Sequence, residues 1–328
     1  MLHLSRSRSI IDSFSLSRMR NSEVLGIMNP SVRILHVGGH FFYLPLISRE
    51  LRKRGFISDI ASSWDASKQD YDFFIGSRFR IRDVKLLNLG RKYDIIHNHS
   101  PYFSSFGLSL LRKFGKRIIK HYHGSDLRVW KLYESEFCLV STPDLLDYAP
   151  NGLWIPNPVD LEAFKPKKGL PNEVPTLLHY EYYTGHKYYD KNPQVKEIYD
   201  HAFKTLQQRG IKFALKTILG IPHDEMPTVI NQSDIIICKV EEALGWYGNM
   251  AVEAMACGKP VVAYIRPDLY EKYKPPVYVT TPENLADKLQ ILIEDANLRK
   301  EFSMLGRRYV QEIHDVKKVA DKLTQIYL

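Results

Sequence analysis

Short apolar runs alternate with helical stretches along most of this chain, and no other feature restricts its fold as much. The runs include VRILHV at 32–37, DIIHNH at 94–99 and RIIKHY at 117–122. Stretches of about 10–15 residues with helical periodicity separate them. Strands that alternate with helices in this way form parallel sheets covered by helices. The sequence therefore predicts an α/β fold.

The alternation occurs twice, on either side of a segment rich in Pro, Lys and Gly at 157–175 that resembles a linker. A chain of 328 residues is long enough for two domains at roughly 150 residues each. We therefore expect two tandem Rossmann-like, doubly wound domains that face a cleft, followed by a helical C-terminal tail. Open α/β sheets bind ligands at the carboxyl ends of their strands, which places the expected site in that cleft.

Residues 1–28 differ from the rest, because they are rich in Ser and Arg and lack both an unbroken apolar segment and a small-residue cleavage site. We expect a disordered extension here rather than a signal peptide, and either Met19 or Met28 could be the start of the protein. The chain has 3 cysteines without metal or redox spacing and no apolar run of roughly 20 residues. These features predict a cytoplasmic protein.

Positive charge is concentrated in the first half. Residues 29–160 carry 19 Lys and Arg against 13 Asp and Glu, whereas residues 161–328 carry 23 against 22. Such asymmetry favours a polyanionic partner. No nucleic-acid-binding module is legible, so nucleic acid is not expected. An anionic membrane surface or a lipid phosphate is the favoured partner, and a solvated basic surface is the alternative.

The segment GWYGNMAVEAMACGKP at 245–260 points to a ligand. A Gly-rich turn opens a short helix, and the free amides at a helix N-terminus attract anions such as phosphate. Glu253 is the one carboxylate on this otherwise apolar helix, and burying it unpaired is costly. A phosphate at the helix end and a hydroxyl acceptor one turn along together suggest a nucleotide. The alternative is a buried helix with a salt-bridged Glu253.

Several segments resemble those of retaining GT-B glycosyltransferases of the group-one (family four) class. IPNPVDLEAFKP at 155–166 is similar to that family's linker, and residues 245–262 are similar to its donor-site segment. YDIIHNHS at 93–100, KHYHGSDLR at 120–128 and HDEMPTVINQSDIII at 223–237 match three further segments in family order. The resemblance implies a GT-B fold with an N-terminal acceptor-side domain at 29–160, a C-terminal nucleotide-sugar donor domain at 161–310, and a helix at 311–328 that packs back towards the N-terminal domain.

The resemblance also assigns roles to individual residues. Glu253 would hold the ribose hydroxyls of a nucleotide diphosphate sugar, His123 would lie near the transferred sugar, and Lys191 would stabilise the leaving phosphates. We expect catalytic roles for these three residues. The expected donor-binding residues are Gly38, Gly39, Lys187, Lys191, Trp246, Tyr247, Gly248, Asn249, Met250 and Glu253.

Two positions depart from the family pattern. The family's phosphate-binding Arg has no clear counterpart, and Lys187 would take its place with a different hydrogen-bond geometry. Gly245 occupies the position of a Glu that contacts the donor sugar in the family, so sugar specificity is less secure than nucleotide binding. Glu241, Glu242 or backbone amides could replace that contact. Trp246 and Tyr247 could stack on a sugar or base, or pack in the core beneath the loop.

The sequence gives little support for a metal site. Asp70 and Asp72 form a DxD pattern, but an apolar run follows it, whereas the metal-binding DxD of other transferases ends a strand. His97, His99, His121 and His123 alternate on two predicted strands and should share one face. No carboxylate or cysteine with ligand spacing accompanies them, so we expect core or cleft histidines.

The resemblance implies a hexosyltransferase-type, metal-independent enzyme without a cofactor. It would move a sugar from its nucleotide diphosphate, with retention, to a hydroxyl of a glycan or lipid-linked glycan. We expect it in the cytoplasm, in peripheral contact with the inner membrane face. The alternatives are a GT-B sugar-nucleotide epimerase and a non-catalytic sugar-nucleotide-binding or membrane-scaffold subunit.

Overall fold

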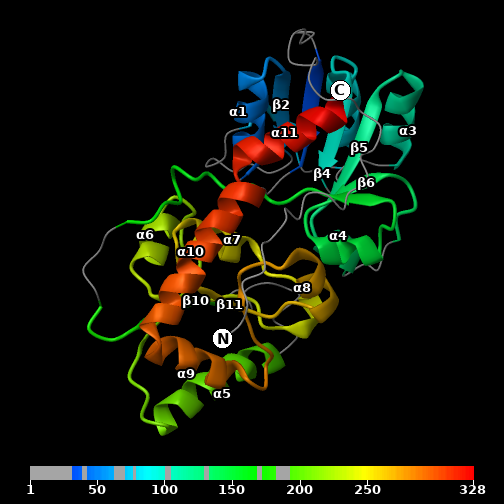
Figure 1. Cartoon of the computed structure of the whole chain (residues 1–328). Helices are drawn as coiled ribbons and strands as arrows, with labels where there is room; N and C mark the ends of the chain where they lie inside the picture. The colour runs from blue at the N-terminus through cyan, green and yellow to red at the C-terminus, as the bar shows by residue number, and fades with distance from the viewer. Residues whose placement is uncertain are drawn as a thin grey trace.

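The computed structural model describes most of the chain after residue 31 (Figure 1). The described ranges are 32–38, 43–62, 71–76, 79–99, 105–128, 133–167, 172–181 and 193–328. The predicted extension at 1–28 and four candidate residues lie outside them. These four residues are Gly39, Asp70, Lys187 and Lys191.

The N-terminal half contains a parallel sheet of seven strands in the order β3-β2-β1-β4-β5-β6-β7. Its first six strands follow a doubly wound order whose connections reverse direction between β1 and β4. The strands are β1 (Arg33–Val37), β2 (Ile57–Ser62), β3 (Phe73–Phe74), β4 (Ile95–His99), β5 (Arg117–Tyr122), β6 (Cys138–Val140) and β7 (Gly152–Trp154).

Helical elements follow most of these strands in the described ranges, as parallel pairing requires. The first, α1, begins with Leu44-Pro45 and buries Leu44, Ile47 and Leu51 against the sheet, so its apolar side has helical spacing. The helical elements of this half are α1 (Leu44–Lys53), α2 (Phe79–Gly90), α3 (Ser105–Lys113), α4 (Ser125–Arg128) and the 3₁₀ helix η3 (Pro143–Asp147). The sequence analysis did not foresee α2, whose apolar residues are not segregated on one face.

The C-terminal half has a parallel sheet of five strands in the order β12-β11-β10-β8-β9. Its central strand β10 is fully buried, because helices cover both of its faces. The strands are β8 (Thr176–Tyr180), β9 (Ala214–Ile218), β10 (Ile235–Ile237), β11 (Val261–Ala263) and β12 (Tyr278–Val279).

The helices of the C-terminal half include the small-residue helix α7, which packs against α10. The helical elements are α5 (Pro193–Gln208), α6 (Met226–Asn231), η4 (Glu242–Leu244), α7 (Asn249–Ala256), α8 (Pro267–Tyr273), α9 (Leu285–Glu294) and α10 (Ala296–Ile313). Among the described residues, none of the helices combines the length and the apolar character that crossing a bilayer requires.

The last helix, α11 (Val316–Tyr327), returns to the N-terminal half and lies across it beside α1 (Figure 1). Val319, Leu323 and Tyr327 join the apolar core formed by α1, β1, β4 and β5. Arg54 donates hydrogen bonds to Asp321 and to the Lys317 carbonyl, which ties the two helices together at the surface. The chain end thus completes the core of the domain that comes first in sequence.

The predicted fold class is confirmed: two parallel α/β sheets with helices on their faces, followed by a helical C-terminal region. The linker segment is more closely attached than its composition suggests. Val159 pairs with Asp315, its N–H donates to the His314 carbonyl at 2.8 Å, and Phe164 is buried in the C-terminal core. The two connections between the halves therefore run side by side.

Candidate functional site

A pocket between the two halves collects residues from both. Tyr43 and Leu46 on α1 form one wall. The linker and the first two turns of α7 form the others. The lining residues from these segments and the loop before α6 are Asn157, Pro158, Val159, Asp160, Phe164, His223, Asn249, Val252 and Glu253. The carboxyl end of β1 leads into α1, so the pocket lies where doubly wound sheets bind ligands.

The N-terminus of α7 forms the floor of this region. Gly248 is its N-cap residue in an extended conformation, and no side chain caps the helix. A Cβ atom on Gly248 would lie 3.4 Å from Lys239 Cε and 4.0 Å from its Nζ, so Lys239 runs directly beneath the start of the helix. Burial lowers the pKa of Lys239. The free amides at the start of α7 themselves offer positive electrostatic potential to a ligand.

Glu253 faces the pocket and is paired. Its Oε1 lies 2.9 Å from Nε2 of His223, and its side chain is 15% exposed. The hydrogen bond to Glu253 raises the pKa of His223, although partial burial acts in the opposite direction. Glu253 thus has a side-chain partner, as the salt-bridge alternative expects, and it also lines the pocket, while its role towards a ribose stays a prediction. His223 begins the segment HDEMPTVINQSDIII, but its pairing with Glu253 was not predicted from the sequence.

Asn249 connects α7 to the linker. Its Oδ1 accepts a hydrogen bond from Nδ2 of Asn157 at 2.6 Å, and the Asn157 carbonyl in turn accepts one from Nδ1 of His314 at 2.7 Å. The first turn of α7 is thereby coupled to the paired connections between the halves. Met250 packs at the edge of the core next to it, partly buried.

His123 lies at the carboxyl end of β5, behind the pocket wall. Its Nδ1 is 2.6 Å from the hydroxyl of Tyr43, and its Nε2 is 3.0 Å from Nδ1 of His99. Burial lowers its pKa well below the usual value, so the ring is neutral at neutral pH. Asp126 holds the turn that follows, accepting from the amides of His123, Gly124 and Leu127. Asp126 belongs to the quoted HGSD segment, yet the sequence analysis gave it no role.

Trp246 and Tyr247 pack in the core of the C-terminal half, with exposed fractions of 3% and 2%. The Trp246 ring contacts Trp154, Tyr247 and Tyr273. The Tyr247 hydroxyl lies 3.0 Å from Tyr309 and 3.0 Å from His314. This arrangement matches the packing alternative, and it turns neither ring towards a ligand.

Gly245 adopts the left-handed conformation, with φ of 65°. A Cβ atom there would meet only Asp144 and Arg266 side chains at 3.7 Å, so space is available but the backbone disfavours an L residue. The absence of an acid at this position therefore follows from the turn itself. The neighbouring Asp147 and Arg266 form an ion pair that joins the two halves.

The remaining candidate residues make contacts within the N-terminal sheet and its helices. The Gly38 amide donates to the Ala61 carbonyl at 3.2 Å at the end of β1. Asp72 accepts from Arg52 and from the Ile60 amide, which is the bonding of a structural carboxylate. The four histidines predicted to share one sheet face do so, and His36 on β1 joins them. Burial lowers the pKa of His36 and of His121 to about 3.

Residues 196–309 match the family model for glycosyl transferases group 1. No curated protein matches the chain. Solved structures share its fold over nearly its whole length. Sucrose-phosphate synthase from Thermosynechococcus elongatus superposes with a TM-score of 0.66 at 15% identity and covers 90% of this chain and 98% of that one.

Two further structures match to a similar extent. HepE from Anabaena, solved in complex with UDP and glucose, gives a TM-score of 0.60 at 14% identity over 90% of this chain and 99% of that chain. The lipopolysaccharide outer core galactosyltransferase WaaB gives 0.57 at 14% identity over the same shares. At such identities the likeness concerns the fold.

Proposed function

We propose that this chain, whose residues 196–309 match the family model for glycosyl transferases group 1 and whose fold resembles solved GT-B structures, transfers a sugar from a nucleotide diphosphate sugar to an acceptor hydroxyl. The observation that carries this proposal is the pocket between the halves. It brings Glu253 and Asn249 of the second half opposite Tyr43 of the first, with His123 directly behind.

The donor would bind mainly to the C-terminal half. The carboxylate of Glu253 is suited to accept hydrogen bonds from ribose hydroxyls, and the amide end of α7 is suited to the diphosphate. Lys191 and Lys187 remain proposed phosphate ligands, and Gly39 a proposed part of the loop over the diphosphate. The anomeric C–O bond to the diphosphate would break as the acceptor oxygen attaches to the same face of the sugar. The leaving phosphate would take the acceptor's proton, so this step needs neither a metal nor a dedicated base.

His123 would position the sugar. It would act through Tyr43, whose hydroxyl lies 2.6 Å from Nδ1 of His123 and whose side chain lines the pocket. Closure of the two halves around the donor would exclude water and limit hydrolysis. The ion pair between Asp147 and Arg266 and the paired connections at Val159 and Asp315 lie at the boundary that such a motion would bend.

The acceptor is proposed to be a glycan precursor at an anionic membrane surface. Helices α2 and α3 pack side by side in the basic half and carry apolar side chains in contact with solvent. Ile81, Val84 and Phe106 are 51%, 58% and 75% exposed. Exposed Lys85, Arg112 and Lys113 accompany them. Apolar and basic side chains together favour an anionic lipid surface.

A panel of nucleotide diphosphate sugars in thermal unfolding tests the donor site, because a ligand that binds the folded state alone raises the unfolding temperature. We expect one base to stabilise the protein, and Glu253→Gln to lose this shift. Glu301→Gln, which changes an exposed carboxylate on α10 of the same half, is the matched control. No stabilisation by any nucleotide would contradict the donor site.

Transfer is tested separately from binding. The stabilising donor, mixed with a lipid extract, should yield a glycosylated product. Gly245 favours a second candidate, a subunit that binds a sugar nucleotide without turning it over, because the turn provides no acid for the sugar. Donor binding without product or hydrolysis would support that candidate. Flotation with vesicles containing anionic lipid at low salt tests the membrane surface, and a protein that stays unbound there would contradict it.

A further inference from the structure

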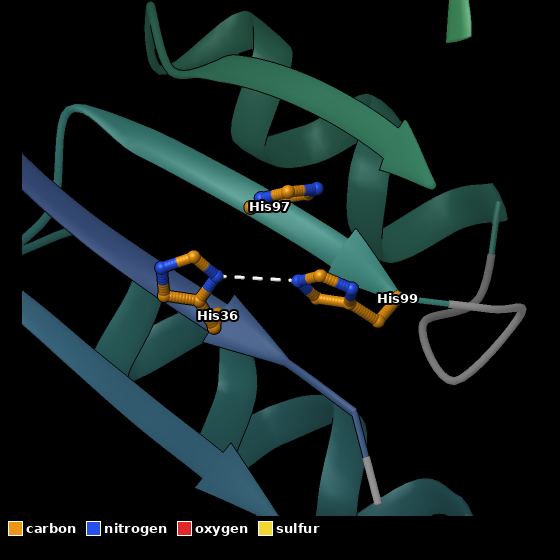
Figure 2. Close-up of side chains that lie close together, drawn as sticks. All are labelled: His36, His97 and His99. Atoms are coloured by element: carbon orange, nitrogen blue, oxygen red, sulfur yellow. Dashed lines mark hydrogen bonds between the residues drawn. The ribbon is translucent and has the colours of Figure 1, made fainter. Parts of the chain in front are cut away.

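Five histidines lie together on one face of the N-terminal sheet. His36 comes from β1, His97 and His99 from β4, and His121 and His123 from β5. The register pairs His36 with His97 and His99 with His121, and alternate residues of a strand point to the same face. Figure 2 shows the ring of His36 facing that of His99 across the two strands, with His97 beside them. We call this set the histidine cluster.

Hydrogen bonds organise the histidine cluster into two chains. In the first, the Tyr43 hydroxyl contacts His123, Nε2 of His123 lies 3.0 Å from Nδ1 of His99, and Nε2 of His99 lies 3.2 Å from Nδ1 of His36. In the second, the Tyr327 hydroxyl lies 2.6 Å from Nδ1 of His97, and Nε2 of His97 lies 3.2 Å from Nδ1 of His121. The tyrosines belong to α1 and α11, which cover this face.

Each chain ends in a buried nitrogen that has no partner in the described part of the protein, Nε2 of His36 and Nε2 of His121. A buried polar atom without a hydrogen bond costs about 1–3 kcal/mol. Such an atom in a folded protein calls for an explanation, and a bound ion is one. The two orphaned nitrogens mark two places where a ligand could complete the cluster.

Two sets of three histidines have ring nitrogens within 4.8 Å of one another: His36 with His97 and His99, and His99 with His121 and His123. They differ in which nitrogens are in use. Both nitrogens of His97 already have partners, so a metal in the first set would break a bond to Tyr327 or to His121. In the second set, a metal would replace only the contact between His99 and His123, whose two facing nitrogens would both become ligands, and His121 has its unpartnered Nε2 to offer.

We propose that His99, His121 and His123 form a binding site for a divalent transition metal ion of the Zn²⁺ class. The ligand atoms would be Nδ1 of His99, Nε2 of His121 and Nε2 of His123. Two Zn–N bonds of about 2.0–2.1 Å at a tetrahedral angle place their nitrogens roughly 3.3 Å apart. The observed 3.0 Å between His99 and His123 is close to that spacing.

The hydrogen bonds around the site support this assignment. With these atoms on the metal, the opposite nitrogen of each ligand must carry its proton. His123 would then donate to Tyr43, His99 to His36, and His121 to His97, which would donate to Tyr327. Each contact between those atoms already exists. Metal-bound histidines regularly donate their second N–H in this way, which fixes ring orientation and strengthens the ligand.

The composition of the site selects the metal. Three imidazole nitrogens suit Zn²⁺, Co²⁺, Ni²⁺ or Cu²⁺, whereas Mg²⁺, Ca²⁺ and Mn²⁺ prefer oxygen ligands. Metal binding requires neutral rings.

This inference shares His123 with the proposed sugar transfer, but its test is independent, because metal occupancy is measured without donor or acceptor. Full-length protein without a polyhistidine tag is stripped with a chelator, and then Co²⁺ is titrated while its d–d absorption is followed. We expect one equivalent bound, with an absorption intensity typical of four-coordinate Co²⁺, and its displacement by one equivalent of Zn²⁺. Absence of stoichiometric binding, or an octahedral spectrum alone, would overturn the proposal.

Variants locate the site. His121→Asn should weaken Co²⁺ binding at least tenfold. Two substitutions serve as controls: His36→Asn removes a cluster histidine outside the proposed set, and His179→Asn removes a buried histidine of the other half. Both should retain stoichiometric binding. A loss in His36→Asn as large as in His121→Asn would overturn the assignment in favour of the other set. Should variants fail to fold, X-ray absorption of the wild-type Zn²⁺ complex decides, because fewer than three imidazoles in its first shell would also overturn the proposal.

Discussion

The two halves of this protein have similar folds, but the interior of the C-terminal half is mainly apolar, whereas that of the N-terminal half contains a group of histidines. The core of the C-terminal half comes from that half and the adjoining linker. Its central strand and α7 consist of apolar and small residues, and the one carboxylate among them, Glu253, is paired. The N-terminal half places five histidines under its covering helices, and α11 completes its core. The first half therefore depends on a distant segment, and its polar interior depends on bonds that α11 and α1 supply.

Loss of a core side chain of α11 should have the largest effect on the stability of the N-terminal half. Leu323 is fully buried between α11 and the N-terminal sheet. Leu323→Ala should lower the free energy of unfolding by about 2–5 kcal/mol, because the lost apolar contact also leaves a cavity. Urea unfolding of the N-terminal half, followed by hydrogen exchange on β1 and β4, measures it. Leu305→Ala on the exposed side of α10 is the control. A smaller loss from Leu323 than from Leu305 would contradict the role of α11.

The Glu253 carboxylate of the C-terminal half should affect ligand binding more than folding stability. Glu253→Gln keeps the shape of the side chain and removes its charge, so we expect nucleotide binding to weaken by about 1.5–3 kcal/mol, the usual value of a hydrogen bond to a charged group. Calorimetric titration with the nucleotide found in the donor panel measures this change. Unchanged affinity would leave Glu253 as a structural partner of His223 alone.

His314 lies where the two halves meet, and its protonation should lower the free energy of unfolding. It is buried between Tyr247 and the Asn157 carbonyl, and burial lowers its pKa to about 4. Its usual pKa is 6.5, so its stabilising effect is complete above pH 6.5 and is lost as the pH falls towards 4. Between pH 7.5 and 5 this amounts to about 2 kcal/mol. Urea unfolding at both pH values should show a smaller pH dependence for His314→Gln than for the wild type. An equal dependence would show that other groups govern it.

Gly245 should show the smallest of these effects. Its left-handed backbone costs an L residue about 1 kcal/mol, and the space around it admits a methyl group. Gly245→Ala should thus lose roughly that amount of stability in thermal unfolding. Gly220→Ala, at another left-handed position with open space around it, is the matched control and should lose a similar amount. A much larger loss at Gly245 would mean that packing rather than backbone conformation determines the cost.

The sequence predicted the strands well, because each parallel strand is a local run of β-branched residues with its own boundaries. β1, β4 and β5 lie where VRILHV, DIIHNH and RIIKHY indicated. The helix α2 escaped prediction, since its residues lack an apolar side. Gly248, Asn249 and Glu253 could be grouped from sequence because they are neighbours on one helix.

Contacts between segments far apart in the chain could not be predicted from local sequence patterns. The pairing of Glu253 with His223, of Asn249 with Asn157 and of His123 with Tyr43 joins residues 30 or more positions apart. The packing of Trp246 and Tyr247 was equally open, because an aromatic residue in a glycine-rich turn suits a ligand or a core. Their burial depends on Trp154, Tyr273 and Tyr309, which come from other elements.

The sequence alone determined the α/β class, the division into two sheets and the position of the glycine-rich turn before α7. These features follow from hydrophobic periodicity and backbone preference, which act over a few residues. The tertiary structure decided which polar groups come into contact. These contacts are the Glu253–His223 pair, the pairing of Val159 with Asp315, and the histidine cluster under α11. Hydrogen bonds and metal ligation require atoms about 3 Å apart, and only the folded chain brings residues from different strands and helices to that distance.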